Sequence, residues 1–327
     1  MERAKSILQE GGSTGAYSES QGRLHVRKNV ARFINLRDGY PENDAYATPE
    51  NVFLTDGASP GVQTILKLLI RGEKDGVMTP IPQYPLYSAT IAALGGSLIP
   101  YYLVEEKNWG LELEELNSSV KKAKESGILP RALVVINPGN PTGSCLTDQN
   151  MEQIIKFCHE NNILLMADEV YQENVYAKNK SFTSFKKKLY SMPQQYRNLE
   201  LVSFHSTSKG VTGECGKRGG YFELTNIDPA VKEQIYKTLS ISLCPNITGQ
   251  LTVDLMVNPP RPVDPSYKQY MDEKAAIFNS LKIRAELIEK KLNELPGISC
   301  QPAEGALYAF PRIQLPQGAI EKAKKEG

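Results

Sequence analysis

Five polar segments follow five apolar, strand-like runs of this 327-residue chain, and their residue types could do chemistry. The segments are DGASPG (56–61), PIPQYPLY (80–87), NPGNPTG (137–143), DEVYQ (168–172) and HSTSKG (205–210). In open α/β sheets, ligands bind beyond the carboxyl ends of the strands, so these segments are expected to meet at one edge of a sheet. There they would bring together a lysine, an acid, an amide and several hydroxyl groups.

The first and third segments each allow a structural and a functional interpretation. DGAS opens a helix with small residues, and the helix N-terminus suits a phosphate. The plain alternative is an ordinary helix cap with Ser59 as the N-cap residue. NPGNPTG is either a simple tight turn or, through a cis X-Pro bond, a device that directs Asn140 toward the strand ends.

The last two segments hold the strongest chemical candidates. Asp168 directly follows an apolar run, where a buried carboxylate needs a partner or a function. Tyr171 lies near it if the chain turns helically. Lys209 stands among hydroxyl groups with no carboxylate beside it in the sequence. Lysine is the side chain that forms a Schiff base with a carbonyl compound.

Other types of site fit the sequence poorly. The glycines near Lys217 lack the spacing of a phosphate-binding loop. The three histidines, His25, His159 and His205, are isolated and form no metal-binding motif. The sequence also lacks the GxSxG motif of a serine hydrolase. The remaining ligand that matches a phosphate site, a stacking tyrosine, a buried acid and a lysine is a flat phosphorylated heterocycle with a carbonyl. Pyridoxal phosphate has all of these features.

The elements that must position these segments alternate along the chain. Strands are expected at 51–55, 76–79, 97–103, 132–136, 163–167, 201–204 and 220–224, and helices at 59–71, 84–94, 112–126, 147–161 and 229–241. Runs such as ALVVI and ILLMA are apolar throughout, which suits strands covered on both faces. The pattern predicts an α/β fold with a mostly parallel sheet.

A proline-rich stretch, NPPRPVDPSYK at 258–268, interrupts this alternation and cannot continue a helix. A long helix is expected after it, at about 266–295, followed by a strand in GALYAFPRI (305–313). We therefore expect a large cofactor-binding domain over 1–257, in which residues 1–30 lead in. Residues 258–327 would form a hinge, a long helix and part of a smaller α+β domain.

Composition argues against several classes of function. The formal net charge is +1, which gives no basic footprint for nucleic acid or an acidic membrane surface. No run of about 18 apolar residues predicts a membrane span. The five cysteines are scattered without disulfide or metal spacing, which favours a reducing, intracellular compartment. The first residues lack the pattern of a signal peptide, and the organelle stays open.

Several longer motifs carry a family resemblance: PIPQYPLYSA, VVINPGNPTG, ADEVYQENVY, FHSTSKG and GECGKRGGY. With them the chain resembles the fold-type I, pyridoxal-phosphate-dependent class I/II aminotransferases, and more narrowly the alanine aminotransferases. The resemblance covers essentially the whole chain. NPGNPTG and SxSK alone would mark only the superfamily, whereas FHSTSKG with GECGKRGGY is narrower.

The resemblance implies a role for each candidate residue. Lys209 would hold the cofactor as a Schiff base and move the proton, and Asp168 would pair with the pyridine nitrogen. Asn140 and Tyr171 would bind the ring 3-oxygen, and Tyr84 would stack on the ring. The phosphate would be bound by the backbone N–H groups of Ala58 and Ser59 and by Ser206, Ser208 and Arg218, with Tyr17 supplied to the neighbouring subunit of a homodimer with shared sites.

The implied reaction moves the amino group of L-alanine to 2-oxoglutarate, giving pyruvate and L-glutamate by a ping-pong mechanism. Similar proteins use glyoxylate as the acceptor, and a lyase or synthase of the same fold is a further alternative. Chains of the family are longer at both ends, so this chain is expected to be a fragment. The arginine that binds the substrate carboxylate would lie beyond Gly327, and Arg312 is not assigned that role. A truncated, non-catalytic subunit is therefore also an alternative.

Overall fold

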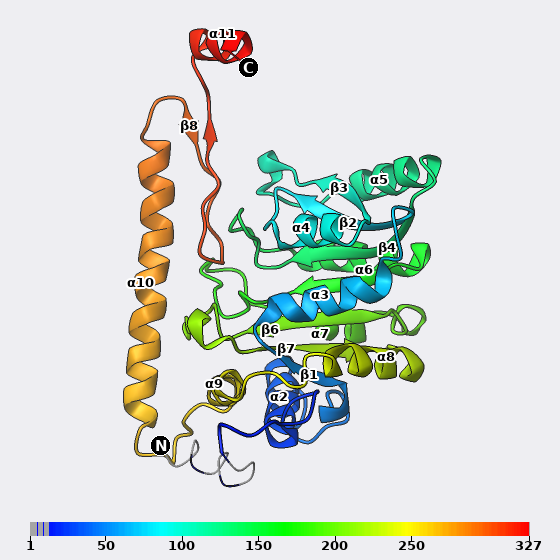
Figure 1. Ribbon diagram of the computed structural model, residues 1–327. Coiled ribbons are helices and arrows are strands. Elements are labelled where there is room, and N and C mark those ends of the chain that lie inside the picture. The colour runs from blue at the N-terminus through cyan, green and yellow to red at the C-terminus, as the bar shows by residue number, and fades with distance from the viewer. Residues whose placement is uncertain (1–4, 6–8, 10–12, 327) are drawn as a thin grey trace.

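A seven-stranded sheet forms the centre of the molecule in the computed structural model, which describes residues 5, 9 and 13–326. The strand order is β1-β7-β6-β5-β4-β2-β3, and only β7 runs antiparallel to its neighbours (Figure 1). The expected mostly parallel α/β sheet is thereby confirmed. The strands are β1 (Val52–Thr55), β2 (Asp75–Ile81), β3 (Ser97–Tyr102), β4 (Leu129–Ile136), β5 (Leu164–Asp168), β6 (Leu201–Ser206) and β7 (Gly220–Thr225).

Helices cover both faces of this sheet. One face packs against α3 (Ala58–Leu69), α4 (Leu86–Ala93) and α8 (Pro229–Ser240). The other packs against α5 (Leu113–Glu125), α6 (Asp148–Asn161) and α7 (Phe185–Ser191), with α2 (Leu24–Asp38) and α9 (Ile247–Val257) over its β1–β7 end.

Strand β4 shows why the central runs are apolar throughout. Leu133 and Val135 point into the core under α5, α6 and α7, whereas Ala132 and Val134 point into the core under α3 and α4. Successive side chains of a strand point to opposite faces, so a strand between two helical layers needs apolar residues at every position. The sheet therefore holds the strand ends in a rigid, two-sided core.

The sequence pattern missed three helices, α2, α7 and α9. Helix α2 buries Val26, Val30 and Ile34, a spacing of four residues that is a signal for an amphipathic helix. Helix α9 begins after Asn246, whose side chain accepts a hydrogen bond from the Gly249 N–H group as an N-cap. Both helices were thus readable from the sequence.

The strand expected over 305–313 is wrong for most of its length. Only Arg312–Ile313 (β9) forms a strand, paired with Ile298–Ser299 (β8). Ala306 has φ 56°, in the left-handed region that interrupts an extended strand, and Pro311 has no N–H group to donate. The segment therefore runs past the sheet domain as irregular chain.

The long helix α10 (Tyr267–Asn293) follows the proline-rich stretch and stands beside the sheet layers (Figure 1). Helix α11 (Gln317–Glu326) ends the described chain at a distance from the sheet. The division into a large and a small domain at residue 258 stays a prediction. In the part of the chain that the structure describes, no helix has the length and apolar character needed to cross a membrane.

A cluster of charged groups is buried between the sheet and helices α2 and α7. Arg37 binds the Asp38 carboxylate through two bonds of 2.8 and 2.7 Å. Lys186 pairs with Glu223, and both side chains are at most 3% exposed. Such groups are tolerated in a core only when each charge has a partner.

Glu169 belongs to the same cluster, but its side-chain carboxyl has only one hydrogen-bond partner among the described residues. Its Oε1 atom accepts a bond of 2.7 Å from the Phe185 N–H group, whereas Oε2 is buried without a partner. Burial raises the pKa of Glu169 to about 8, although the charge of Arg37 opposes the rise. At neutral pH the folded protein therefore holds a proton on Glu169 that the unfolded chain releases.

This proton predicts a specific pH dependence of stability. Between its ordinary pKa of about 4.3 and the folded value of about 8, Glu169 binds more protons in the folded state, so the free energy of unfolding falls as pH rises. Glu169→Gln should remove this fall and so gain roughly 4 kcal/mol on the wild type between pH 5 and 8.5. Urea unfolding at several pH values measures the difference.

Glu114→Gln, a change at an exposed position of α5, is the control and should follow the wild type at all pH values. Parallel stability curves for Glu169→Gln and the wild type would contradict the buried, protonated state of Glu169.

Candidate active site

One cavity of about 180 Å³ opens at the carboxyl ends of the parallel strands. The cavity is lined by every residue that the sequence indicated except Tyr17: Ala58, Ser59, Tyr84, Asn140, Asp168, Tyr171, Ser206, Ser208, Lys209 and Arg218. Its lining is completed by Leu86, Ile136, Val170 and Cys215. The five polar segments, spread over some 160 residues of sequence, thus meet as the topology predicted.

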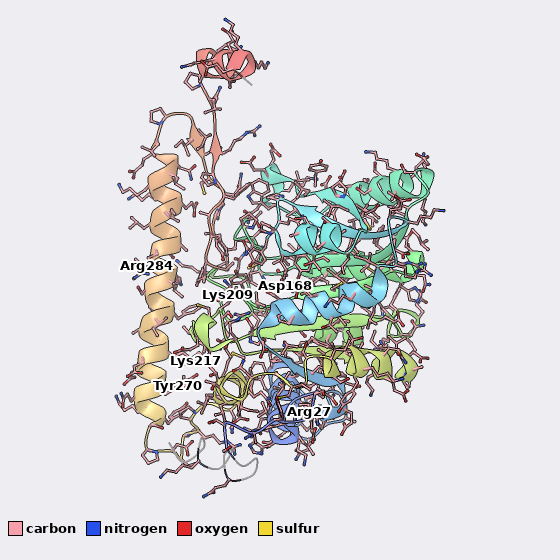
Figure 2. All side chains as sticks on the ribbon, in the orientation of Figure 1. Arg27, Asp168, Lys209, Lys217, Tyr270 and Arg284 are labelled. Carbon is pink, nitrogen blue, oxygen red and sulfur yellow. The ribbon has the colours of Figure 1, made fainter. Side chains whose placement is uncertain are left out.

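Lys209 lies in the turn that follows β6 and is half-buried. Its Nζ atom is 5.7 Å from the centre of the Tyr171 ring. Within residues 13–326, the structure shows no ion pair to Lys209, and Figure 2 places it with Asp168 on the side of the sheet that faces α10. Lys209 therefore lines the cavity beside the Tyr171 ring, together with Asp168.

Asp168 ends β5 and is buried. The Tyr87 hydroxyl donates a hydrogen bond of 2.8 Å to Oδ2, and the Val170 N–H group donates one of 3.4 Å to Oδ1. Burial raises the pKa of the Asp168 carboxyl, while these two bonds and the charge of Lys209 oppose the rise. A cationic group bound in the cavity would stabilise the carboxylate further.

Three polar side chains form a chain of hydrogen bonds beside Asp168. The Asn140 amide donates to the Tyr171 hydroxyl at 3.3 Å, and that hydroxyl donates to the Tyr308 hydroxyl at 3.0 Å. The Asn140–Pro141 peptide bond is cis, and Asn140 lines the cavity as expected. Burial and the Tyr308 contact raise the pKa of Tyr171, so its hydroxyl is protonated and can donate at neutral pH.

The opposite end of the cavity suits an anion. Helix α3 begins at Ala58 after Gly57, which has φ 86° and contributes no capping side chain. The Arg218 guanidinium donates to the Asp56 carbonyl at 2.9 Å and to the Ser208 hydroxyl at 3.4 Å. A Cβ atom at Gly57 would lie 2.3 Å from Arg218 Nη2, so a larger residue would displace this arginine, and the positive φ would strain that residue.

The alternative interpretation of Ser59 as an ordinary N-cap is wrong. Gly57 occupies the N-cap position, and Ser59 is the second residue of the helix. The first N–H groups of α3 therefore have no side-chain acceptor within the helix start and can bind an anion.

Two predicted residues lie at or outside the rim of the cavity. Tyr84 lines the cavity, and its side chain is 46% exposed. Tyr17 is 79% exposed in the segment before α2 and does not line the cavity. The stacking role of Tyr84 and the intersubunit role of Tyr17 stay predictions.

Sequence reasoning missed Tyr87 and Tyr308, which contact the predicted residues directly. Tyr87 is the last residue of PIPQYPLY and is fully buried, which is unusual for a tyrosine without a hydrogen-bond partner. The sequence signal for Tyr87 is its place in a polar segment that follows a strand, whereas its burial and its partner Asp168 are set by the fold. Tyr308 lies in the irregular segment 305–313, where the sequence pattern predicts a strand, so its position could not be inferred.

The donor set fits a flat, phosphorylated ring. The α3 N-terminus with Arg218 would hold a phosphate, Asp168 would face a ring nitrogen, and Lys209 can reach a carbonyl carbon between them. No group of three or more metal-ligating side chains occurs in the described part of the chain. The donors that line the cavity therefore fit pyridoxal phosphate.

The comparison with known protein families agrees with this geometry. Residues 1–324 match the family described as "Aminotransferase class I and II", and the chain belongs to that family. Its members use pyridoxal phosphate.

Curated relatives and solved structures give the same family and fold. The chain is 56% identical to the "Probable alanine aminotransferase, mitochondrial" of Dictyostelium discoideum, over 99% of this chain and 60% of that protein. It is 52% identical to "Glutamate--glyoxylate aminotransferase 1" of Arabidopsis thaliana, over 99% of this chain and 67% of that protein. The alanine aminotransferase structure from Pyrococcus furiosus matches with a TM-score of 0.80 at 25% identity, over 96% of this chain and 72% of that one. The chain thus spans about 60% of the first relative's length.

Tyr87 gives a testable prediction. Tyr87→Phe removes the side-chain donor to the Asp168 carboxylate and should weaken the binding of pyridoxal phosphate roughly tenfold, as expected for a lost bond to a charged group. A titration followed by absorbance measures the affinity.

Tyr101→Phe is the matched control. Tyr101 is equally buried, but its hydroxyl donates to the Val134 carbonyl and not to Asp168. Equal losses of affinity in both variants, or none in Tyr87→Phe, would contradict the role of Tyr87.

Proposed function

We propose that the chain carries the pyridoxal-phosphate site of an alanine aminotransferase, which moves the amino group of L-alanine to 2-oxoglutarate by a ping-pong mechanism. The observation that carries the proposal is the single cavity that holds Lys209, Asp168 and the N-terminus of α3. Alanine aminotransferase relatives at 56% and 52% identity support the choice of substrates.

Asp168 would hold the cofactor in its reactive state. Bound pyridoxal phosphate supplies an aldehyde that condenses with amines and a ring that withdraws electrons from the substrate α-carbon. The Asp168 carboxylate would accept a hydrogen bond from the protonated ring nitrogen. Because Asp168 is buried, the attraction between the two opposite charges would be strong. Tyr87 would keep the carboxylate aimed at the ring through the Oδ2 bond.

Lys209 would bind the cofactor and then move the substrate proton. Its amine reaches the cavity from the turn after β6 and has no ion-pair partner among residues 13–326. An amine in this position can take a proton from the substrate α-carbon and return one on the same face, which is general acid–base work. The sheet supplies the orientation that this step needs.

The remaining side chains would fix the position of the ring. The Asn140 amide and the Tyr171 hydroxyl, joined at 3.3 Å, would bind the ring 3-oxygen. The N–H groups of Ala58 and Ser59, with Ser206, Ser208 and Arg218, would hold the phosphate. Tyr84 would stack on the ring from the rim.

We further propose a homodimer in which Tyr17 reaches the neighbouring subunit's phosphate. The 79% exposure of Tyr17 supports this, because a tyrosine that contacts a partner chain is exposed in a single chain. Several relatives bear mitochondrial names, and an intracellular compartment is proposed on that basis.

Glyoxylate is a second candidate for the amino acceptor. Two glutamate–glyoxylate aminotransferases of Arabidopsis thaliana are 52% and 51% identical to this chain. With L-alanine as the donor, formation of L-glutamate from 2-oxoglutarate and of glycine from glyoxylate separates the two. A larger kcat/KM for glyoxylate would replace the proposed acceptor.

Lys209→Ala tests the proposal most directly. The variant should lose the visible absorbance band of cofactor joined to the lysine and lose amino transfer from L-alanine, because no amine remains to move the proton. It should still bind the cofactor noncovalently through the phosphate-binding end. Absorbance before and after L-alanine, with retention of the cofactor on dialysis, gives both readouts.

Lys217→Ala is the control, because Lys217 belongs to the same loop region but does not line the cavity. An unchanged band and turnover in Lys209→Ala would refute the assignment. Loss of the band in Lys217→Ala to the same extent would show that any lysine change disturbs the loop.

Asp168→Ala should lower the rate of amino transfer roughly hundredfold or more, because the ring nitrogen loses the group that keeps it charged. Glu169→Gln is the neighbouring control, since Glu169 points to the opposite face of the sheet and contacts Phe185 instead of the cavity. A single-turnover measurement with L-alanine compares the two. A rate for Asp168→Ala within a few fold of the wild type would show that the ring lies elsewhere.

A further inference from the structure

The structure brings one carboxylate to the Lys209 turn from a distant part of the sequence. Gly210, the residue after Lys209, has φ 70°, and a Cβ atom there would lie 2.7 Å from Oε2 of Glu173. The Cα atoms of residues 209 and 210 are about 3.8 Å apart. The Oε2 atom of Glu173 therefore lies within the length of a lysine side chain from the Lys209 Cα atom.

Glu173 is already engaged by a lysine from another element. Lys274 of α10 donates a bond of 2.7 Å to Glu173 Oε1, with 35% and 24% of the two side chains exposed. Burial opposes the charged form of Lys274, but the charge of Glu173 and its hydrogen bond raise the Lys274 pKa overall. One oxygen of Glu173 thus faces α10 and the other faces the Lys209 turn.

We propose that Lys274 is a positioning residue for Lys209: it holds Glu173 in an ion pair and so prevents that carboxylate from pairing with the Lys209 amine. The inference rests on the proposed role of Lys209. An ammonium group paired with Glu173 could neither join the cofactor nor accept the substrate proton. A carboxylate beside a lysine favours its charged form.

Among the described residues, Lys274 is the cation that forms an ion pair with Glu173. Tyr270 of α10 lies one turn before Lys274 and contributes to its charged state. The groove along this face is lined by further titratable groups, Glu214, Lys217 and Glu273, and by Lys274 itself. On the cavity side the titratable and charged groups are Tyr84, Asp168, Tyr171, Lys209, Cys215 and Arg218.

The Lys274–Glu173 pair is one of two described contacts between helix α10 and the 171–176 segment. The helix has no buried residue of its own, and it meets the 171–176 segment through Lys274 and, four residues on, through Phe278, whose ring centre lies 5.6 Å from that of Tyr176. A purely structural pair would only fasten α10 to this segment. A positioning pair would also set the ionisation of Lys209, and the two roles give different results.

The test measures Lys209 in the protein without cofactor, so it does not depend on catalysis. Labelling with an amine-reactive reagent at several pH values, followed by mass spectrometry of each lysine, gives the pH midpoint of Lys209. The exposed Lys237 on α8 serves as the internal reference. The variants are Lys274→Met, Glu173→Gln, the double variant and Lys274→Arg.

Lys274→Met should raise the Lys209 midpoint by about one pH unit or more, because Glu173 becomes free to pair with it. Glu173→Gln should leave the midpoint unchanged or lower it. The double variant should return it to the wild-type value, and Lys274→Arg should not move it. With pyridoxal phosphate, Lys274→Met alone should weaken the band of cofactor joined to Lys209.

Equal shifts in Lys274→Met and Glu173→Gln, or no shift in either, would overturn the inference and leave a structural anchor. A normal pattern of midpoints together with a cofactor band that survives in Lys209→Ala would instead refute the proposed function. The two failures are therefore distinguishable.

Discussion

A buried carboxylate at the end of a central strand is the constraint on which the site depends. Asp168 has been removed from water by the layers on both sides of β5, and burial raises its pKa. Such a group is maintained only if donors or a cation stabilise its charge. Tyr87 supplies one bond from α4, and the cavity leaves room for a cationic ring to supply the rest. In the proposed function, this carboxylate would set the position of the cofactor ring relative to Lys209.

The neighbouring acid shows how the sheet separates two roles. Asp168 and Glu169 are adjacent in sequence, but successive residues point to opposite sides of the strand. Asp168 lines the cavity, whereas Glu169 joins the buried charged cluster under α2 and α7 and bonds to Phe185. Two carboxyl groups with raised pKa values thus belong to different functions: one faces ligand chemistry, and the other affects only the stability of the fold.

The sequence predicted the strand ends well because the physics there is local. Apolar runs such as 132–136 and 163–167 can only be strands covered on both faces, and polar residues directly after them must reach one edge. The prediction failed where long-range contacts decide. The segment 305–313 looks extended, but its backbone leaves the strand region at Ala306, and it delivers Tyr308 to Tyr171. Tyr87 was missed because its partner is 81 residues away in sequence.

The same limit applies to the environment of Lys209. In the sequence the lysine has hydroxyl neighbours and no acid, which suits an amine that must lose its proton. Folding brings Glu173 against Gly210 and thereby creates the neighbour that the sequence avoids. Lys274 of α10, a helix without buried residues, forms an ion pair with that carboxylate. The surroundings of Lys209 are thus built by three elements, the β6 turn, the 171–176 segment and α10, and a local sequence motif can specify only the first.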